Sequence, residues 1–172
     1  MIRQATEQDR MALGKIYCFS WKEAYKNIVP DEYLNSLTIE KCSPNKINSN
    51  DTLVIEDNGI IVGLTRFGEA RDKRCENIGE LWSIYILPEF WMKGFGQLLF
   101  SSVTKKLEEL GYEKFYLWVL KDNFGALRFY EKMGMINTNI EQIINIGGKD
   151  LVEIKYEFSL KNSLNYLRRI ER

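Results

Sequence analysis

Ile84-Tyr-Ile-Leu-Pro-Glu-Phe-Trp-Met-Lys-Gly-Phe-Gly-Gln-Leu-Leu99 is the stretch of this chain that decides its fold. An apolar strand runs into Pro88, a short loop carries Gly94 and Gly96, and an apolar helical pattern follows the loop. Such a loop exposes backbone N–H groups, and the start of a helix adds about half a positive charge. The order of strand, glycine-bearing loop and helix therefore predicts a seat for a phosphate group.

The two glycines alone do not identify the ligand, because a tight turn before a helix explains them equally well. The loop is not a Walker A loop, since no Gly-Lys-Ser/Thr follows it. It is not a complete dinucleotide fingerprint either, because Leu99 stands where the third glycine would be.

A second segment, Leu117–Gly134, predicts a strand followed by a short helix that Asp122 or Asn123 caps. Tyr130 follows Asn123 by about two helical turns, so the two side chains lie on the same side of the helix. An amide and a phenol would then border one groove. An N-cap beside a tyrosine of the core is the alternative interpretation.

Together, the two segments resemble the GNAT superfamily of N-acetyltransferases, which use acetyl-CoA. The resemblance extends over roughly 2–158 in the order of the elements. The pyrophosphate loop of the family reads Gln/Arg-x-x-Gly-x-Gly/Ala, and the matching positions here read Trp91-Met92-Lys93-Gly94-Phe95-Gly96. Trp91 replaces the usual Gln or Arg, and Met92 stands where many members have Gly. A positive φ at Met92 would strain the loop by roughly 1–3 kcal/mol.

The resemblance implies an α/β (α+β) fold with a mixed, mostly antiparallel central sheet. It implies about six to seven strands, splayed between the fourth and the fifth, and about four flanking helices. We expect residues 1–160 to form a single acetyltransferase domain, and 161–172 to form a C-terminal tail that is helical or frayed.

The order of the elements agrees with this fold. Asn58-Gly59 predicts a hairpin between strands at 52–55 and 60–67. Apolar spacing predicts a first helical segment that ends by Val29, and the polar stretch Cys42–Asp51 reads as a loop.

The resemblance also implies which residues contact the cofactor. The main-chain N–H of Ile86 would face the thioester carbonyl, Asn123 would bond the pantetheine arm, and Tyr130 would protonate the departing thiolate. The complete expected cofactor set is Ile84, Tyr85, Ile86, Trp91, Met92, Lys93, Gly94, Phe95, Gly96, Gln97, Asn123, Ala126 and Tyr130.

A general base is needed because an alkyl amine with a pKa near 10.4 must lose a proton before it attacks. The chain has no histidine, so a carboxylate acting through ordered water is the expected route. Glu80 is the best candidate, because some members of the family carry their catalytic Glu at this place. Its even offset of six from Ile86 predicts that the two side chains share a face of the strand. A solvated carboxylate at a strand end is the alternative.

Aromatic residues of the less conspicuous segments are candidates for the acceptor site. Trp21, Tyr25, Tyr33 and Trp82 could line it, although core packing explains them as well. The acidic residues Glu23, Asp31 and Glu32 could attract an amine, and solvated helix ends are the alternative.

Composition narrows the class of protein. The 172 residues include 24 basic and 24 acidic side chains, a balance that argues against a nucleic-acid partner. Three scattered cysteines and no histidine predict neither a disulfide framework nor a metal site. No apolar run is long enough for a signal peptide or a membrane span, so we expect a cytoplasmic protein. The family often forms homodimers, and nothing in this sequence decides that point.

These observations predict an enzyme that moves the acetyl group of acetyl-CoA to a primary amine. The acceptor is a small-molecule or peptide amine, and it attacks directly within a ternary complex. The alternatives are a non-catalytic acyl-CoA sensor on the same fold and an enzyme for longer acyl groups. A doubly wound nucleotide-binding domain is disfavoured by the missing third glycine and by the strand hairpins.

Overall fold

The computed structural model describes residues 1–72, 74–75 and 77–162. They form one seven-stranded sheet in the order β1-β2-β3-β4-β5-β7-β6. The strands are β1 (Ile2–Gln4), β2 (Thr52–Asp57), β3 (Ile60–Glu69), β4 (Ile78–Ile86), β5 (Lys114–Leu120), β6 (Ile136–Ile146) and β7 (Lys149–Ser159). Of the expected tail, residues 163–172 lie outside the described part of the chain.

Five α-helices flank the sheet within the described residues. They are α1 (Arg10–Ala24), α2 (Asp31–Ser36), α3 (Ile39–Cys42), α4 (Phe95–Glu109) and α5 (Phe124–Lys132). Short 3-10 turns cover Glu7–Asp9, Pro88–Phe90 and Leu160–Asn162. The first helix ends at Ala24 rather than near Val29. The sequence did not predict α3, which begins where the Thr38 hydroxyl accepts a hydrogen bond from the Lys41 N–H.

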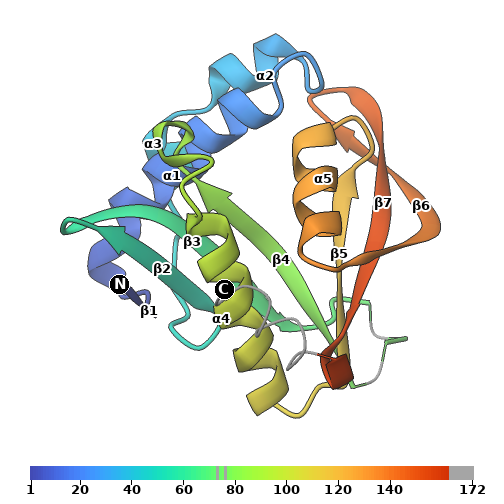
Figure 1. Ribbon diagram of the computed structural model, residues 1–172. Coiled ribbons are helices and arrows are strands. Elements are labelled where there is room, and N and C mark those ends of the chain that lie inside the picture. Colours follow the sequence, from blue (N-terminus) through green and yellow to red (C-terminus); the bar gives the residue numbers. More distant parts are fainter. Residues whose placement is uncertain (73, 76, 163–172) are drawn as a thin grey trace.

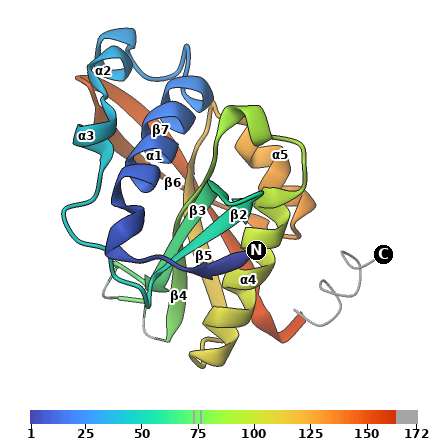
Figure 2. The ribbon, with the colours of Figure 1, turned by 90° about the vertical axis from the view of Figure 1, so that its left-hand side faces the viewer.

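The helices cover the two faces of the sheet as separate layers, with α4 and α5 opposite α1, α2 and α3 (Figure 2). The larger core lies on the α4 side and includes Leu99, Phe100 and Val103 of α4, all fully buried. On the other side, smaller apolar clusters join α1 and α2 to the sheet. The sheet therefore has two unlike faces, one packed by α4 and α5 and one covered by α1.

Strands β4 and β5 are the one parallel pair in the described sheet, and they separate soon after they meet (Figure 1). Their pairing begins at Ile78 with Lys114 and ends at Glu80 with Tyr116. Beyond Glu80, the side of β4 that faces β5 has no strand partner. The mixed, mostly antiparallel sheet and its splay between the fourth and fifth strands are thus confirmed.

A β-bulge in β4 changes the face on which its side chains lie. Ser83 pairs with Arg66 and Leu81 pairs with Phe67, so Trp82 is an extra residue in β4. Leu81 and Ile86 consequently face the same α4-side core although their separation is odd. The prediction that Glu80 shares a face with Ile86 is therefore wrong, because the bulge inverts the alternation between them.

Asp9 fixes the start of the first helical segment by binding Arg3. Asp9 Oδ2 accepts hydrogen bonds from Arg3 Nη1 at 2.7 Å and from the Thr6 N–H at 2.7 Å. The bond with Arg3, followed by the bonds with Thr6, outweighs desolvation and lowers the pKa of Asp9 from 3.8 to about 2. Because the pKa is lower in the folded protein, this stabilisation is complete above pH 4 and is lost as the pH falls through 2.

We expect Asp9→Asn to lower the free energy of unfolding by about 1–2 kcal/mol at pH 7. The loss should lie in the lower part of this range, because the Arg3 side chain is partly exposed and solvent screens the pair. The deficit should shrink between pH 4 and pH 2 as the wild-type carboxylate takes up its proton. Urea unfolding at pH 7, 5, 4 and 3 measures this, with the exposed Asp122→Asn as control. A deficit that stays constant over this range would contradict the assignment.

Candidate functional site

The loop between β4 and α4 presents a run of unbonded backbone N–H groups. Gly94 caps α4 with φ 86°, a conformation that favours glycine. None of the hydrogen bonds among the described residues uses the N–H groups from Met92 to Gln97. The first turn of α4 contains no acidic side chain that would repel an anion. This run of N–H groups at a helix start suits a phosphate or pyrophosphate group.

Met92 adopts the left-handed conformation with φ 61°, and its side chain is completely exposed. A glycine would hold this backbone without strain, so methionine makes the loop less stable than the usual family residue would. The positive φ also keeps the chain path that a glycine would give.

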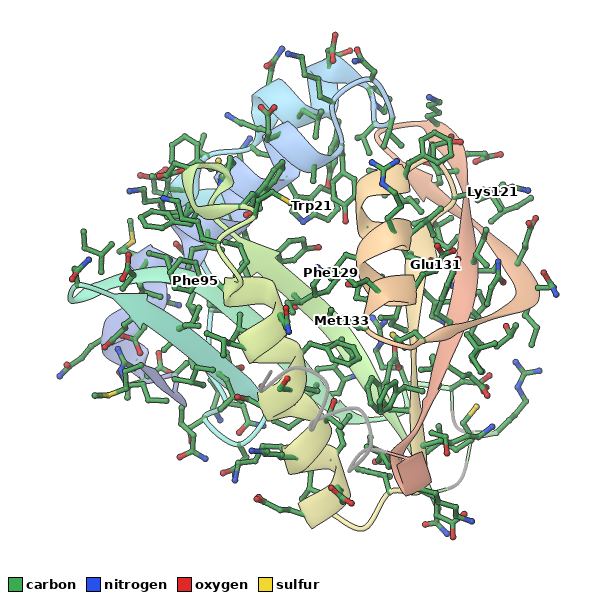
Figure 3. The ribbon with its side chains drawn as sticks, viewed as in Figure 1. Trp21, Phe95, Lys121, Phe129, Glu131 and Met133 are labelled. Carbon is green, nitrogen blue, oxygen red and sulfur yellow. The ribbon has the colours of Figure 1, made fainter. Side chains whose placement is uncertain are left out.

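Two contacts hold the loop against its surroundings. The Lys93 ammonium lies over the Phe90 ring at 4.6 Å, which places a positive charge beside the N–H groups. A Cβ on Gly96 would come within 3.3 Å of Phe129, so α5 packs closely against the start of α4. Figure 3 shows Phe95 at this start and Phe129 on the facing side of α5.

The unpaired edge of β4 forms one wall of the gap between β4 and β5. The Leu87 N–H donates to the Val62 carbonyl, which fixes the hydrogen-bonding phase between β3 and β4. In an antiparallel pair, the bonding direction alternates from residue to residue. The main-chain groups of Ile84 and Ile86 therefore point away from β3, towards β5.

One of these main-chain groups already has partners. The Ile86 carbonyl accepts hydrogen bonds from the Trp91 indole Nε1 at 2.7 Å and from Ser20 Oγ at 2.9 Å. Trp91 thus reaches back from the loop to the edge of β4. The indole N–H therefore binds a carbonyl that could otherwise accept a hydrogen bond from a bound ligand.

Tyr130 lies on α5, in the same core cluster as Ile86 of β4 and close enough to Tyr85 for the two phenols to interact. Its side chain is buried, yet its hydroxyl makes no hydrogen bond to any described residue. Burial, followed by the proximity of the Tyr85 phenol, raises the pKa of Tyr130 above its ordinary value. The group therefore keeps its proton at neutral pH and can donate it to a partner that arrives in the gap.

Asn123 caps α5 as expected, because its Oδ1 accepts a hydrogen bond from the Ala126 N–H at 3.1 Å. The side-chain Nδ2 makes no hydrogen bond within the described residues. One side chain can consequently cap the helix through its oxygen and donate to a ligand through its nitrogen.

Glu80 is almost completely buried and saturated with donors. Its carboxylate accepts hydrogen bonds from the Arg71 N–H at 2.8 Å, from Arg71 Nε at 2.9 Å and from the Tyr116 hydroxyl at 3.1 Å. Arg71 Nη2 also bonds the same carboxylate. Glu80 faces the α1 side of the sheet together with Tyr116. Burial, followed by the charge of Glu80, raises the pKa of the Tyr116 phenol.

A cavity of about 580 Å³ lies on that same face, between α1, α3 and strands β3 and β4. Trp21, Tyr33 and Trp82 of the expected acceptor set line it, while Tyr25 lies behind Trp21 with the two ring centroids 4.7 Å apart. Figure 3 shows Trp21 on α1. The size suits a small-molecule ligand.

Tyr85 connects this cavity with the gap. Its side chain lines the cavity rather than the cofactor side, and its phenol interacts electrostatically with Tyr130. Burial raises the pKa of Tyr85 well above its ordinary value. The acidic residues Glu23, Asp31 and Glu32 are exposed and do not line the cavity.

Comparison with known proteins identifies the family to which this chain belongs. The model of the acetyltransferase (GNAT) family matches residues 12–135, which is more than half of the chain. The chain belongs to the GNAT family of acetyltransferases. The match covers the glycine-bearing loop, the gap and the helix with Tyr130.

Two curated GNAT relatives are similar over most of their length. The chain is 29% identical over 133 residues to an uncharacterised N-acetyltransferase of Bacillus subtilis, covering 76% of each protein. It is also 29% identical over 162 residues to a spermidine N(1)-acetyltransferase of Thermoplasma acidophilum, covering 91% of this chain and 97% of the relative.

Solved structures show the same GNAT fold. An N-acetyltransferase from Thermoplasma acidophilum, crystallised with coenzyme A, superposes with a TM-score of 0.68 at 24% identity, covering 92% of this chain and 98% of that one. A putative acetyltransferase from Salmonella typhimurium with acetyl-CoA gives 0.68 at 21% identity, covering 93% of each chain.

The sequence did not point to several of the residues that line the cavity. Four cationic side chains line the cavity: Lys41, Lys46, Arg66 and Arg71. They come from separate segments, so no motif joins them. Only the position of Arg66 in a predicted strand offered a signal. Within the described residues, no helix has both the length and the apolar character needed to cross a bilayer.

Proposed function

We propose that this GNAT acetyltransferase transfers the acetyl group of acetyl-CoA to a primary amine, which attacks directly while both substrates are bound. The observation that carries the proposal is the hydroxyl of the buried Tyr130 side chain, which makes no hydrogen bond to any described residue and lies close enough to Tyr85 of β4 for the two phenols to interact. A phenol that is protonated at neutral pH can give its proton to a leaving thiolate.

Hydrogen-bond donors that have no partner among the described residues would suffice to bind coenzyme A. The N–H groups from Met92 to Gln97 would hold the pyrophosphate, with Lys93 adding charge. The open edge of β4 would pair with the pantetheine arm as a further strand would, and Asn123 Nδ2 would donate to it. Acetyl-CoA supplies the activated acyl group.

The chain would act on the reaction through two donors. The N–H of Ile86 points into the gap and would stabilise negative charge that develops on the thioester oxygen. As the amine nitrogen forms its bond to the acetyl carbon, the carbon–sulfur bond breaks. The sulfur takes the proton of Tyr130. The nitrogen loses one proton to water, and a proton from water returns to the Tyr130 phenolate, which closes the cycle.

Glu80 would act as the general base only through ordered water, because the bulge at Trp82 turns its side chain to the other face of β4 from Ile86. The carboxylate of Glu80 faces away from Ile86 and already accepts bonds from Arg71 and Tyr116. Its contacts support a positioning role for the Arg71 segment at the wall of the cavity. A catalytic role for Glu80 remains a prediction, and the pH profile of a Glu80→Gln variant bears on it.

Release of free CoA thiol tests the proposal. Purified protein with acetyl-CoA should release thiol only when a suitable primary amine is added, and propionyl-CoA and butyryl-CoA in parallel reactions test the acyl group. Calorimetry on the same preparation measures binding of acetyl-CoA. Tight binding without thiol release across a broad amine panel would contradict the proposal and favour an acyl-CoA sensor. A faster rate with a longer acyl group would correct the donor.

A further inference from the structure

Among the described residues, the side chains that line the acceptor cavity include positive charges and no negative charge. Lys41, Lys46, Arg66 and Arg71 line it, and no Asp or Glu is among the lining residues. Such a wall repels a polycation and concentrates an anion. A site for a polyamine, the acceptor in the name of the Thermoplasma relative, would be expected to show the opposite charge.

The four cations are not equally available, because carboxylates behind the wall neutralise some of them. The Arg71 guanidinium forms an ion pair with the buried Glu80 carboxylate. The Lys41 ammonium donates to a backbone carbonyl of α2, and Lys46 makes no ion pair within the described residues. The charge that remains lies with Arg66 and with the lysines at the rim.

Arg66 has only a weak counter-ion. Its Nη2 lies 3.5 Å from Asp51 Oδ2, and the side chain is 43% exposed. Asp51 already accepts hydrogen bonds from Asn48 Nδ2 at 3.0 Å and from Thr52 Oγ1 at 2.6 Å. The Tyr17 phenol interacts with the same guanidinium. Asp51 and Tyr17 are both weak partners for a group with five N–H donors, so Arg66 can still bind an oxyanion.

Trp82 adds a donor without a partner beside Arg66. The Arg66 guanidinium lies over the Trp82 ring at 5.4 Å, so the ring holds it in place. The indole Nε1 of Trp82 is buried, and no described residue accepts a hydrogen bond from it. A buried donor without an acceptor is unfavourable, and an oxygen of a ligand would satisfy it.

We propose that the amine acceptor carries an anionic oxygen group, a carboxylate or a phosphate, at the end opposite its amine, and that Arg66 binds this group. The inference rests on the acetyl transfer proposed above and specifies its acceptor. Trp82 positions the guanidinium and lines the same wall. The amine end then points past Tyr85 towards the gap that holds Tyr130.

A series of primary amines tests the charge preference. Its members share one alkyl length and differ at the far end, which is a carboxylate, a phosphate, a carboxamide or a second ammonium. Thiol release is compared at equal concentrations of the neutral amine. We expect kcat/KM for the better anion to exceed that for the carboxamide at least about 10-fold and that for the diamine by about 100-fold. The faster of the two anions identifies the group.

Arg66 variants test the assigned contact. Arg66→Gln should lower the ratio of kcat/KM for the anionic amine over the carboxamide about 10-fold or more, and Arg66→Lys should retain part of it. In the wild type, KM for the anionic amine should rise with ionic strength. Arg74→Gln is the matched control, since Arg74 is exposed and lies outside the cavity lining, and it should leave the ratio unchanged.

The outcomes separate this inference from the proposed function. Thiol release that is faster with the diamine or the carboxamide would overturn the anionic acceptor and leave acetyl transfer intact. An unchanged ratio in folded Arg66→Gln would overturn the role of Arg66. No thiol release with any amine, although acetyl-CoA binds, would overturn the proposed function itself.

Discussion

Replacing Tyr130 by Phe is expected to lower kcat about 100- to 1,000-fold, with the dissociation constant of acetyl-CoA nearly unchanged. The hydroxyl is the only part of the side chain that the variant loses, and it makes no hydrogen bond within the described residues. The fold should therefore be as stable as the wild type. The loss should fall on the step in which the sulfur leaves and needs a proton.

The pH dependence adds a second check. Burial raises the pKa of Tyr130 above its ordinary value of 10.0. The phenol should therefore keep its proton throughout an assay from pH 7 to pH 9.5. We expect kcat of the wild type to show no fall over this range from loss of the acid.

Stopped-flow or steady-state thiol release measures kcat, and calorimetry measures binding of acetyl-CoA. Tyr112→Phe is a matched control, because Tyr112 lies between α4 and β5 and belongs to no part of the proposed site. If Tyr130→Phe keeps kcat within about threefold of the wild type, the proton reaches the sulfur from another donor.

Replacing Arg71 by Ala is expected to lower the free energy of unfolding by about 3 kcal/mol. The carboxylate of Glu80 is 1% exposed, and the guanidinium of Arg71 is its counter-ion. Without that guanidinium, a buried negative charge keeps only the Arg71 N–H and the Tyr116 hydroxyl as donors. The expected loss is at the lower end of the range for a buried charge that loses its counter-ion, because these two donors remain and the Arg71 side chain is itself 64% exposed.

Urea unfolding of a double-mutant cycle measures this interaction. Glu80→Gln removes the charge, so Arg71→Ala combined with Glu80→Gln should be more stable than the sum of the two single losses predicts. Arg74→Ala is the control, because its pair with Asp72 is exposed and should contribute less than about 0.5 kcal/mol. Equal losses in Arg71→Ala and Arg74→Ala would contradict the importance of the buried carboxylate.

The parts of the fold that sequence predicted best are those that depend on local backbone chemistry. The loop at Gly94, the cap at Asn123 and the hairpin at Asn58-Gly59 each follow from one or two residues whose conformational preferences are strong. The splay of β4 from β5 was predicted as well, through the resemblance of two segments to a family with that feature.

The parts that sequence did not predict depend on contacts across the fold. The extra residue at Trp82 has no local signal, since a bulge is defined by the partner strand, and it reversed the predicted face of Glu80. The cationic wall is assembled from residues on α3, the loop after α3, β3 and the loop after β3, which have no common spacing. Tyr85 is one of the expected cofactor residues, and its side chain lines the cavity on the α1 side of the sheet.

The hydrogen bond from the Trp91 indole to the Ile86 carbonyl occupies an acceptor on the edge of β4 along which the proposed cofactor would lie. An incoming amide of the pantetheine arm would exchange with the indole rather than add a new bond, so this contact contributes little net affinity. When the product leaves, the indole can close the same carbonyl again before water does. We expect this internal competitor to favour rapid release of spent CoA, so that the enzyme is suited to repeated turnover rather than to storing its cofactor.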